Sequence, residues 1–233
     1  MWRTGHVMIR DIDLTPPEFV ENREPRCPVI LLLDTSRSMA GAPIDQLNAG
    51  LAGLIGDLRA DPLAALRVEL AIIAFGDRPR LVSPFRTADD LDTPVLKAGG
   101  QTPMGQALHL GLEAVAECKT LYRRLGVPYY RPWIFLITDG TPTDGALYKT
   151  AAARLHEAEA EGKLSFYVVA VEGADLSTLG RIAPPHRPPY RLDSLKFREL
   201  FQWLSASVRR ASSGRITPGG EPMPPTASWS GRG

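Results

Sequence analysis

The fold is decided by one stretch, Val29-Ile-Leu-Leu-Leu-Asp-Thr-Ser-Arg-Ser-Met39, an apolar run that ends in an acid and two serine hydroxyls. Its branched aliphatic residues are too few to span a membrane, and they are typical of a strand buried on both faces. A buried strand cannot hold an unpaired carboxylate, so Asp34 must lie where the strand emerges. The stretch therefore predicts a parallel α/β sheet with polar chemistry at the end of this strand.

Ser36 and Ser38 follow Asp34 at alternate positions, so that in a loop their hydroxyls can converge on the carboxylate. Three hard oxygen donors this close together suit a hard cation such as Mg²⁺. The alternative is that Asp34 and Ser36 only turn the chain and cap the next helix. The stretch alone favours neither interpretation.

A second apolar run, Trp133-Ile-Phe-Leu-Ile-Thr138, is also followed by an acid, Asp139. Between the two runs, Gly99-Gly-Gln-Thr-Pro103 places the hydroxyl of Thr102 in a tight turn. In open α/β sheets, ligands bind beyond the carboxyl ends of the strands. The rest of the sequence thus favours a metal site, and we expect five side chains around one divalent ion: Asp34, Ser36, Ser38, Thr102 and Asp139.

Strand and helix patterns alternate along the chain, which predicts an α/β fold with a doubly wound, Rossmann-like sheet of six strands and helices on both faces. The sheet is expected to be mostly parallel, with residues 80–83 as one antiparallel edge strand. Residues 84–101 are expected to form a long loop that delivers Thr102.

The folded domain is expected to span residues 26–212. Residues 1–25, which contain several prolines, are expected to form an irregular arm, in which residues 7–14 could add a short edge strand. Residues 213–233 are rich in Gly, Pro, Ser and Thr and are expected to be a disordered tail.

A net charge of +1 argues against nucleic acid or a membrane surface as the partner. Two cysteines provide neither a disulfide framework nor the spacing of a zinc site, which is consistent with reduced thiols. No segment has the pattern of a signal peptide or the length of a membrane span. We therefore expect a soluble, cytoplasmic protein.

The Asp-x-Ser-x-Ser, Thr and Asp pattern resembles the metal-ion-dependent adhesion site of von Willebrand factor A domains, residue by residue. Within that family the sequence looks most similar to bacterial tellurite-resistance-type proteins. That similarity rests on four stretches: Leu31-Leu-Leu-Asp-Thr-Ser-Arg-Ser-Met39, Gly99-Gly-Gln-Thr-Pro-Met-Gly105, Arg131-Pro-Trp-Ile-Phe-Leu-Ile-Thr-Asp-Gly140 and Phe197-Arg-Glu-Leu-Phe-Gln-Trp-Leu204.

The resemblance implies a protein-interaction module that is not an enzyme and that holds Mg²⁺, or else Mn²⁺ or Ca²⁺. The serines and the threonine would touch the metal, while the two acids would act largely through bound water. A partner protein would complete the metal shell with an Asp or Glu carboxylate, and a kinase and phosphatase pair in a stress system is one expectation for the partners. The surrounding rim is expected to contain Arg37, Met39, Gln101, Pro103 and Thr141.

Two alternatives remain open. Asp34 could be the nucleophile of a metal-assisted phosphoryl-transfer enzyme, although such enzymes need a second acid where this chain has Ser36, and no glycine-rich phosphate loop follows the first strand. Relatives of the tellurite-resistance type usually have glycine where this chain has Arg37. A cation at that position could repel the metal, so a fold that has lost its ion is the second alternative.

Overall fold

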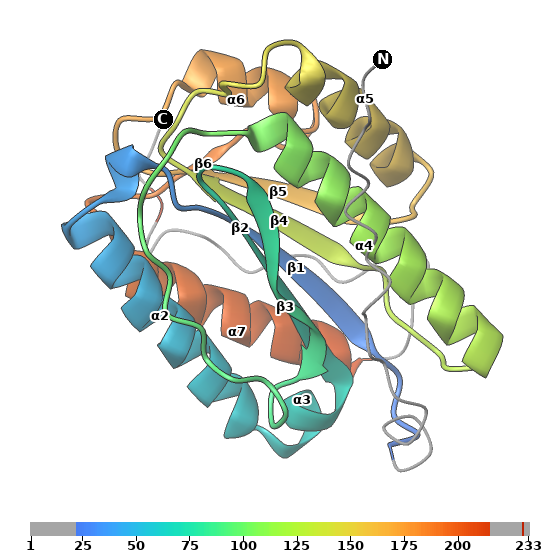
Figure 1. Cartoon of the computed structure of the whole chain (residues 1–233). Coiled ribbons are helices and arrows are strands. Elements are labelled where there is room, and N and C mark those ends of the chain that lie inside the picture. The colour runs from blue at the N-terminus through green and yellow to red at the C-terminus, as the bar shows by residue number, and fades with distance from the viewer. Residues whose placement is uncertain (1–21, 215–229, 231–233) are drawn as a thin grey trace.

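The computed structural model describes residues 22–214 and residue 230. A mixed sheet with the strand order β3-β2-β1-β4-β5-β6 forms its centre (Figure 1). All neighbouring strands are parallel except β3, which is antiparallel to β2 and lies at the edge of the sheet. The predicted fold class is confirmed. The strands are β1 Cys27–Asp34, β2 Val68–Phe75, β3 Pro79–Thr87, β4 Trp133–Thr138, β5 Ser165–Ala170 and β6 Tyr190–Arg191.

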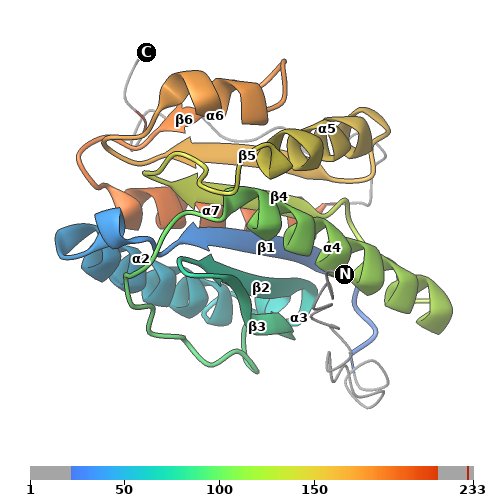
Figure 2. The same cartoon turned by 45° about the horizontal axis from the view of Figure 1, so that its top comes forward.

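Helices cover both faces of the sheet, with α4 crossing in front of it in Figure 1 and α7 lying behind it. One face carries α2, α3 and α7, and the other carries α4, α5 and α6 (Figure 2). The helices are α2 Ala42–Arg59, α3 Pro62–Arg67, α4 Met104–Leu125, α5 Leu147–Ala160, α6 Leu176–Ile182 and α7 Phe197–Ser213, and a short 3₁₀ helix, η1 Arg37–Met39, follows β1.

The central strand β1 is buried along its whole length, as the apolar run predicted. Leu31 and Leu33 pack in the core beneath α2 and α7, while Ile30 and Leu32 pack in the core beneath α4. This alternation follows from the period of a strand, in which successive side chains point to opposite faces. Because β1 has helices on both sides, every position must be apolar until the strand ends at Asp34.

The long connection before α4 differs from the prediction at its start. Residues 84–87 belong to β3, so the loop spans 88–103 rather than 84–101. Pro84 is compatible with a strand there because β3 lies at the sheet edge and its pairing with β2 shifts register nearby. The sequence pattern also missed α3, which Asp61 caps by accepting hydrogen bonds from the backbone N–H groups of Leu63 and Ala64.

Two polar side chains of α2 hold this loop against the helix. Asn48 donates to the carbonyl of Leu96 and accepts from its N–H, at 2.9 and 2.8 Å. Arg59 donates to the carbonyls of Ala88 and Leu91, at 2.8 and 2.5 Å. The loop that leads to Thr102 therefore has a fixed path although it has no regular structure.

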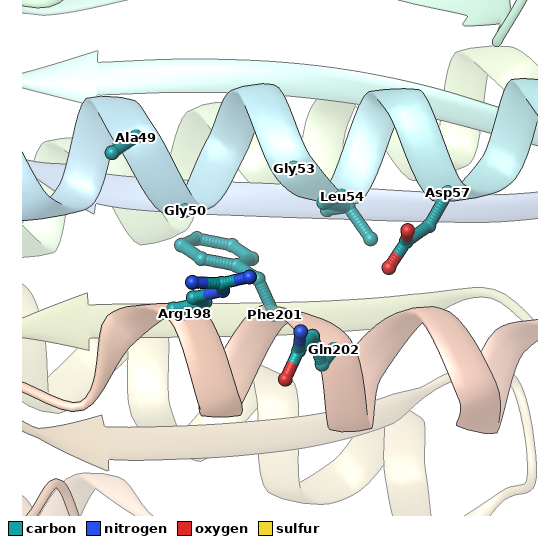
Figure 3. A pocket seen from close by; sticks show the side chains of 8 residues that line it. All are labelled: Ala49, Gly50, Gly53, Leu54, Asp57, Arg198, Phe201 and Gln202. Atoms are coloured by element: carbon teal, nitrogen blue, oxygen red, sulfur yellow. The ribbon is translucent and has the colours of Figure 1, made fainter.

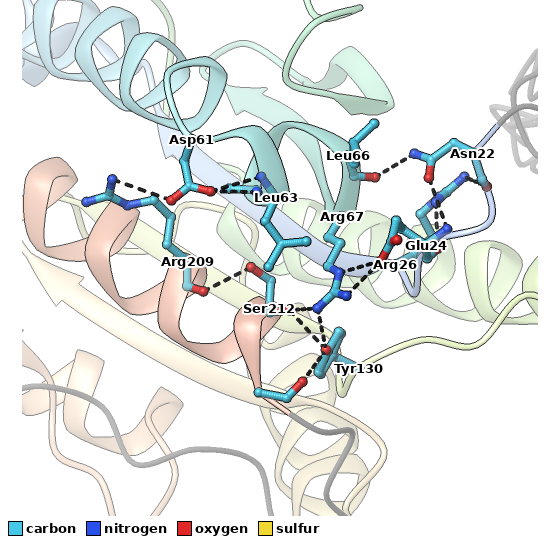
Figure 4. A network of polar contacts seen from close by, with 12 residues as sticks. Asn22, Glu24, Arg26, Asp61, Leu63, Leu66, Arg67, Tyr130, Arg209 and Ser212 are labelled. Carbon is cyan, nitrogen blue, oxygen red and sulfur yellow. Dashed lines mark hydrogen bonds and ion pairs between the residues drawn. The ribbon is translucent and has the colours of Figure 1, made fainter.

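Near the start of β1, a polar network joins the first residues that the structure describes to the end of α7 (Figure 4). Arg67 of α3 pairs with Glu24 at 2.7 Å and donates to the carbonyl of Ser212 at the end of α7. Tyr130 donates to the same carbonyl at 3.0 Å. The arm predicted for residues 1–25, with its possible strand at 7–14, and the tail predicted for 213–233 lie mostly outside the described residues.

Cys27 and Cys118 are both free and buried. Burial raises the pKa of the Cys27 thiol to about 12 and that of Cys118 well above its ordinary value. Both thiols are therefore protonated and unreactive at neutral pH.

Among the described helices, none is both long enough and apolar enough to cross a membrane.

The packing of α2 on α7 depends on a glycine. A Cβ atom at Gly50 would lie 2.5 Å from the ring of Phe201 and 3.1 Å from the carbonyl oxygen of Phe197. Gly53, one turn further along α2, has no atom within 4 Å of such a Cβ. Figure 3 shows these two glycines on the side of α2 that faces Phe201 across a shallow groove.

We predict opposite effects for two alanine substitutions on α2. Gly50→Ala should lower the free energy of unfolding by about 1–3 kcal/mol, because Phe201 must leave its packed position. Gly53→Ala should raise it by about 0.5–1 kcal/mol through helix propensity alone. Urea unfolding measures both, and equal effects at the two positions would contradict the packing described here.

Candidate functional site

The candidate site lies where β1 and β4 end side by side. The two strands are parallel neighbours in the sheet, with Leu33 paired to Ile137. Asp34 is the last residue of β1, and Asp139 directly follows β4. Both acids therefore emerge at the same edge of the sheet, as expected from their places in the sequence.

Asp34 is completely buried, and its two oxygens have different partners. Oδ1 accepts from the backbone N–H of Ser36 at 2.8 Å, and Oδ2 accepts from the hydroxyl of Thr138 at 2.5 Å. Thr138 also accepts from the N–H of Gly140 at 3.0 Å. From the sequence, Thr138 is expected only as part of the apolar strand, and its role in fixing Asp34 emerges from the structure.

A chain of hydroxyls connects the β1 loop to Asp139. The Oγ atoms of Ser36 and Ser38 lie 3.0 Å apart, and the Ser38 hydroxyl donates to Oδ1 of Asp139 at 2.9 Å. Ser36 is buried, Ser38 is exposed and Asp139 is half-buried. The site thus opens to solvent on the side of Ser38.

Thr102 reaches the same place from the loop before α4. A Cβ atom on Gly140 would lie 2.8 Å from the Thr102 hydroxyl oxygen and 3.2 Å from Oδ2 of Asp34. The hydroxyl and the carboxylate therefore both approach Gly140, in space that any larger residue would fill. The structure brings together all five residues predicted from the sequence: Asp34, Ser36, Ser38, Thr102 and Asp139.

The loop after β4 holds Thr102 in place. Thr143 accepts from the N–H of Thr102 at 3.1 Å, and its own N–H donates to the Thr102 carbonyl at 2.9 Å. Asp144 accepts from the N–H of Gln106 in the first turn of α4 at 2.8 Å. Neither residue was predicted from the sequence, although a Thr and an Asp so soon after Asp139 fit a loop that caps a neighbouring helix.

The loop after β1 is joined to the glycine turn before Thr102 by two backbone hydrogen bonds. Gly99 donates to the carbonyl of Thr35 at 2.8 Å, and Arg37 donates to that of Gly100 at 3.2 Å. Backbone contacts therefore set the relative positions of the two loops, and the site side chains are free to face an ion.

The two carboxylates lie in an environment that disfavours negative charge. Burial raises the pKa of Asp34 to about 6 and outweighs the opposing hydrogen bonds from Thr138 and Ser36; nearby Asp139 adds to the rise. Burial also raises the pKa of Asp139, against the hydrogen bond from Ser38. Within the described residues neither acid has an ion pair with a Lys or Arg.

The donor chemistry suits a hard ion. The described residues contain no group of three or more His, Cys, Asp or Glu side chains that could hold a metal. The donors gathered here are instead three hydroxyls and two carboxylates, all of them oxygen. Such a set matches Mg²⁺ or a similar cation and does not match zinc, which is held mostly by nitrogen and sulfur.

The predicted rim is partly wrong. Arg37, Gln101 and Thr141 are exposed. Met39 is fully buried in the core with α2, because η1 turns its side chain inward, and Pro103 is buried at the start of α4. Neither buried residue can contact a partner, although the sequence analysis had placed both on the surface.

Solved structures share this fold at low sequence identity. Proximal thread matrix protein 1 from the mussel byssus matches at a TM-score of 0.55 and 15% identity, covering 81% of this chain and 49% of that one. The pilus adhesin SpaC from Lactobacillus rhamnosus GG, in its open conformation, matches at a TM-score of 0.61 and 13% identity, covering 80% of this chain and 31% of that one. The ArnB paralog VWA2 from Sulfolobus acidocaldarius matches at a TM-score of 0.52 and 16% identity, covering 78% of this chain and 45% of that one.

At such identities these likenesses establish the fold alone, and the chain spans less than two thirds of the length of each of these proteins. No curated protein sequence matches the chain. The similarity to tellurite-resistance-type proteins is not tested by these comparisons and stays a prediction.

The family model of the von Willebrand factor type A domain matches residues 29–203, which include most of β1, all five candidate ligands and the beginning of α7. Domains of this family typically serve as protein-interaction modules. The chain belongs to the von Willebrand factor type A domain family.

Proposed function

We propose that this protein is a metal-dependent interaction module, in which Mg²⁺ at the end of β1 binds a carboxylate of a partner protein. One observation carries the proposal: Asp34, Ser36, Ser38, Thr102 and Asp139 come from three separate loops and gather their oxygens at one edge of the sheet. The alternative of a turn and helix cap accounts poorly for this convergence, because η1 and α2 have no side-chain cap.

The charges of the site support a bound cation. Asp34 and Asp139 carry up to two negative charges where burial disfavours them, and a divalent ion would compensate both. The hydroxyls of Ser36, Ser38 and Thr102 would contact the ion, while the two acids would contribute charge largely through bound water. When bound, the ion supplies an electrophilic position that attracts a carboxylate.

The partner's carboxylate would approach from the side of Ser38, which is exposed, while Asp34 lies at the buried end of the site. Arg37, Gln101 and Thr141 are the exposed members of the predicted rim and would contact the partner around that carboxylate. The positive charge of Arg37 would attract an acidic segment, which gives this departure from the usual glycine a function in binding.

The phosphoryl-transfer alternative is less well supported. A nucleophilic Asp34 would have to reach a phosphate, but it is completely buried and both of its oxygens accept hydrogen bonds. Two residues further on, where such an enzyme needs an acid or base, the chain has Ser36, whose hydroxyl lies beside that of Ser38.

The alternative of a lost metal depends on Arg37. Its side chain is exposed and, among the described residues, makes no ion pair with Asp34 or Asp139. A cation in that position does not replace the metal by neutralising the acids directly. This favours retention of the ion.

We further propose a cytoplasmic protein in a bacterial stress system of the tellurite-resistance type, with a kinase and phosphatase pair as candidate partners. This finer assignment rests on the motif resemblance alone.

We predict that Thr102→Ala abolishes Mg²⁺ binding and metal-dependent partner capture while the protein stays folded, because the residue lies on a loop. Thr102→Ser keeps the hydroxyl and should retain both properties. Titration calorimetry measures the metal affinity, and a pull-down with and without chelator measures capture. Equal Mg²⁺ affinity in wild type and Thr102→Ala would refute the proposed ligand set.

Gly140→Ala should also remove metal binding, because its methyl group would occupy the space between Thr102 and Asp34. Gly99→Ala, in the neighbouring loop, is the matched control, since no atom lies within 4 Å of a Cβ there. The heat of Mg²⁺ binding should be lost in the first variant and kept in the second. Normal binding by Gly140→Ala would mean that the ion lies elsewhere.

In the metal-free protein, Asp34→Asn should be stabilising at pH 7.5. The pKa of Asp34 is about 6 in the folded state against an ordinary 3.8, so the ionised carboxylate destabilises the fold above pH 6 by about 2–3 kcal/mol. This cost disappears as the pH falls through 6 towards 3.8.

Chemical unfolding in the presence of chelator should therefore give Asp34→Asn a higher free energy of unfolding than wild type at pH 7.5. Near pH 4 the two free energies should be equal. Adding Mg²⁺ at pH 7.5 should raise the stability of wild type only. A variant that is less stable than wild type in chelator at pH 7.5 would contradict the buried charge.

A further inference from the structure

A groove runs beside the candidate site, between the edge strand β3 and the loop that precedes α4. Its volume is about 440 Å³. In Figure 1 this loop crosses α2 on its way to α4. The residues that matter for its chemistry are Thr35, Arg80, Val82, Val95, Leu96 and Lys97.

The groove exposes apolar surface on a fixed backbone. Val95 is 79% exposed and Val82 37% exposed, and no other large hydrophobic residue in the described chain is as exposed as Val95. The neighbouring Leu96 is buried, and its backbone is held on both sides by Asn48. Val95 is thus presented to solvent by a loop that cannot fold it inward.

The groove also carries two positive charges without compensation. Arg80 and Lys97 are exposed, and neither makes a side-chain hydrogen bond or ion pair with any residue that the structure describes. Arg78 is exposed in the preceding turn, next to Asp77, which packs against Gly100. Arg80 and Lys97 are the charged side chains among the residues that line the groove, and both are positive.

The groove adjoins the loop after β1 that carries candidate ligands of the metal. Thr35, which lines the groove, is the residue between Asp34 and Ser36 in the chain. Its carbonyl accepts from Gly99, two residues after Lys97. A chain segment bound at the metal would reach the groove by passing over the joined backbone of Thr35 and the glycine turn at Gly99 and Gly100.

We propose that the groove binds the residues adjoining the metal-bound carboxylate, as one extended acidic segment of the partner protein. A second acidic side chain of that segment lies between Arg80 and Lys97, and an apolar side chain covers Val82 and Val95. An extended segment suits this pattern because its successive side chains point to opposite sides. The inference rests on the proposed function, since the first carboxylate is the one that completes the metal shell.

The test begins with a displayed library of short random peptides, selected on the full chain in the presence of Mg²⁺. We expect enriched peptides to carry at least two acids with an apolar residue between or beside them. Fluorescence anisotropy then measures their affinity for wild type, for the double variant Arg80→Gln with Lys97→Gln, and for a control, Arg123→Gln with Arg124→Gln. The control removes the same charge from exposed positions at the far end of α4.

The groove variant should bind about tenfold more weakly at low salt, and the difference should shrink as salt is added. The control variant should bind like wild type, and calorimetry should give all three proteins the same Mg²⁺ affinity. Val95→Ser should weaken peptide binding as well, whereas Leu125→Ser, on another exposed apolar residue, should not.

Peptides without paired acids, or equal affinity of wild type and the groove variant, would overturn the groove assignment. If chelator abolishes binding and the groove variant does not weaken it, the proposed function stands and the groove assignment fails. If chelator has no effect and the groove variant loses binding, the groove stands and the metal function fails. A single-stranded DNA oligonucleotide that binds through Arg80 and Lys97, in place of acidic peptides, would assign the groove to phosphate and contradict a protein partner.

Discussion

The parallel pairing of β1 with β4 is the constraint on which the rest of the structure depends. Two neighbouring strands that run in the same direction must end at the same edge, so the acid that ends each of them is placed next to the other. Helices on both faces make the strands apolar along their length and leave the ends as the only places for polar groups. Burial then raises the pKa of both carboxylates, and the site acquires a need for positive charge that the described protein does not meet.

The hydroxyls determine how this need can be met. A lysine or arginine at Ser36 or Thr102 would have neutralised the acids and closed the site, as in an ordinary buried ion pair. Hydroxyl groups supply oxygen without charge, which leaves the compensation to an ion from solvent and, through it, to a carboxylate from outside. The surrounding cations Arg37, Arg80 and Lys97 are exposed and stay apart from the two acids, so they are available to a partner.

Much of this arrangement was predictable from sequence because strand and helix periods are strong signals. The buried run Trp133–Thr138 was recognised with its observed bounds, and the order of elements followed from the alternation of patterns. The five candidate ligands could be grouped because strand ends in a parallel sheet meet at one edge. The metal itself is a prediction from the chemistry of these five oxygen donors.

What escaped prediction depends on contacts between loops. The support that Thr138, Thr143 and Asp144 provide becomes visible only once the β4–α5 loop is known to lie against the start of α4. Met39 looked like a surface residue because it follows the serines, but the short turn η1 directs it into the core. Residues 84–87 looked like loop because of Pro84, which an edge strand tolerates.

A crystal structure with Mn²⁺, which scatters anomalously and prefers the same oxygen donors, tests the central claim most directly. The account predicts an anomalous peak within coordination distance of the hydroxyls of Ser36, Ser38 and Thr102, with Asp34 and Asp139 close behind. A protein saturated with Mn²⁺ that shows no peak there, or shows it only at other acidic residues, would contradict the account.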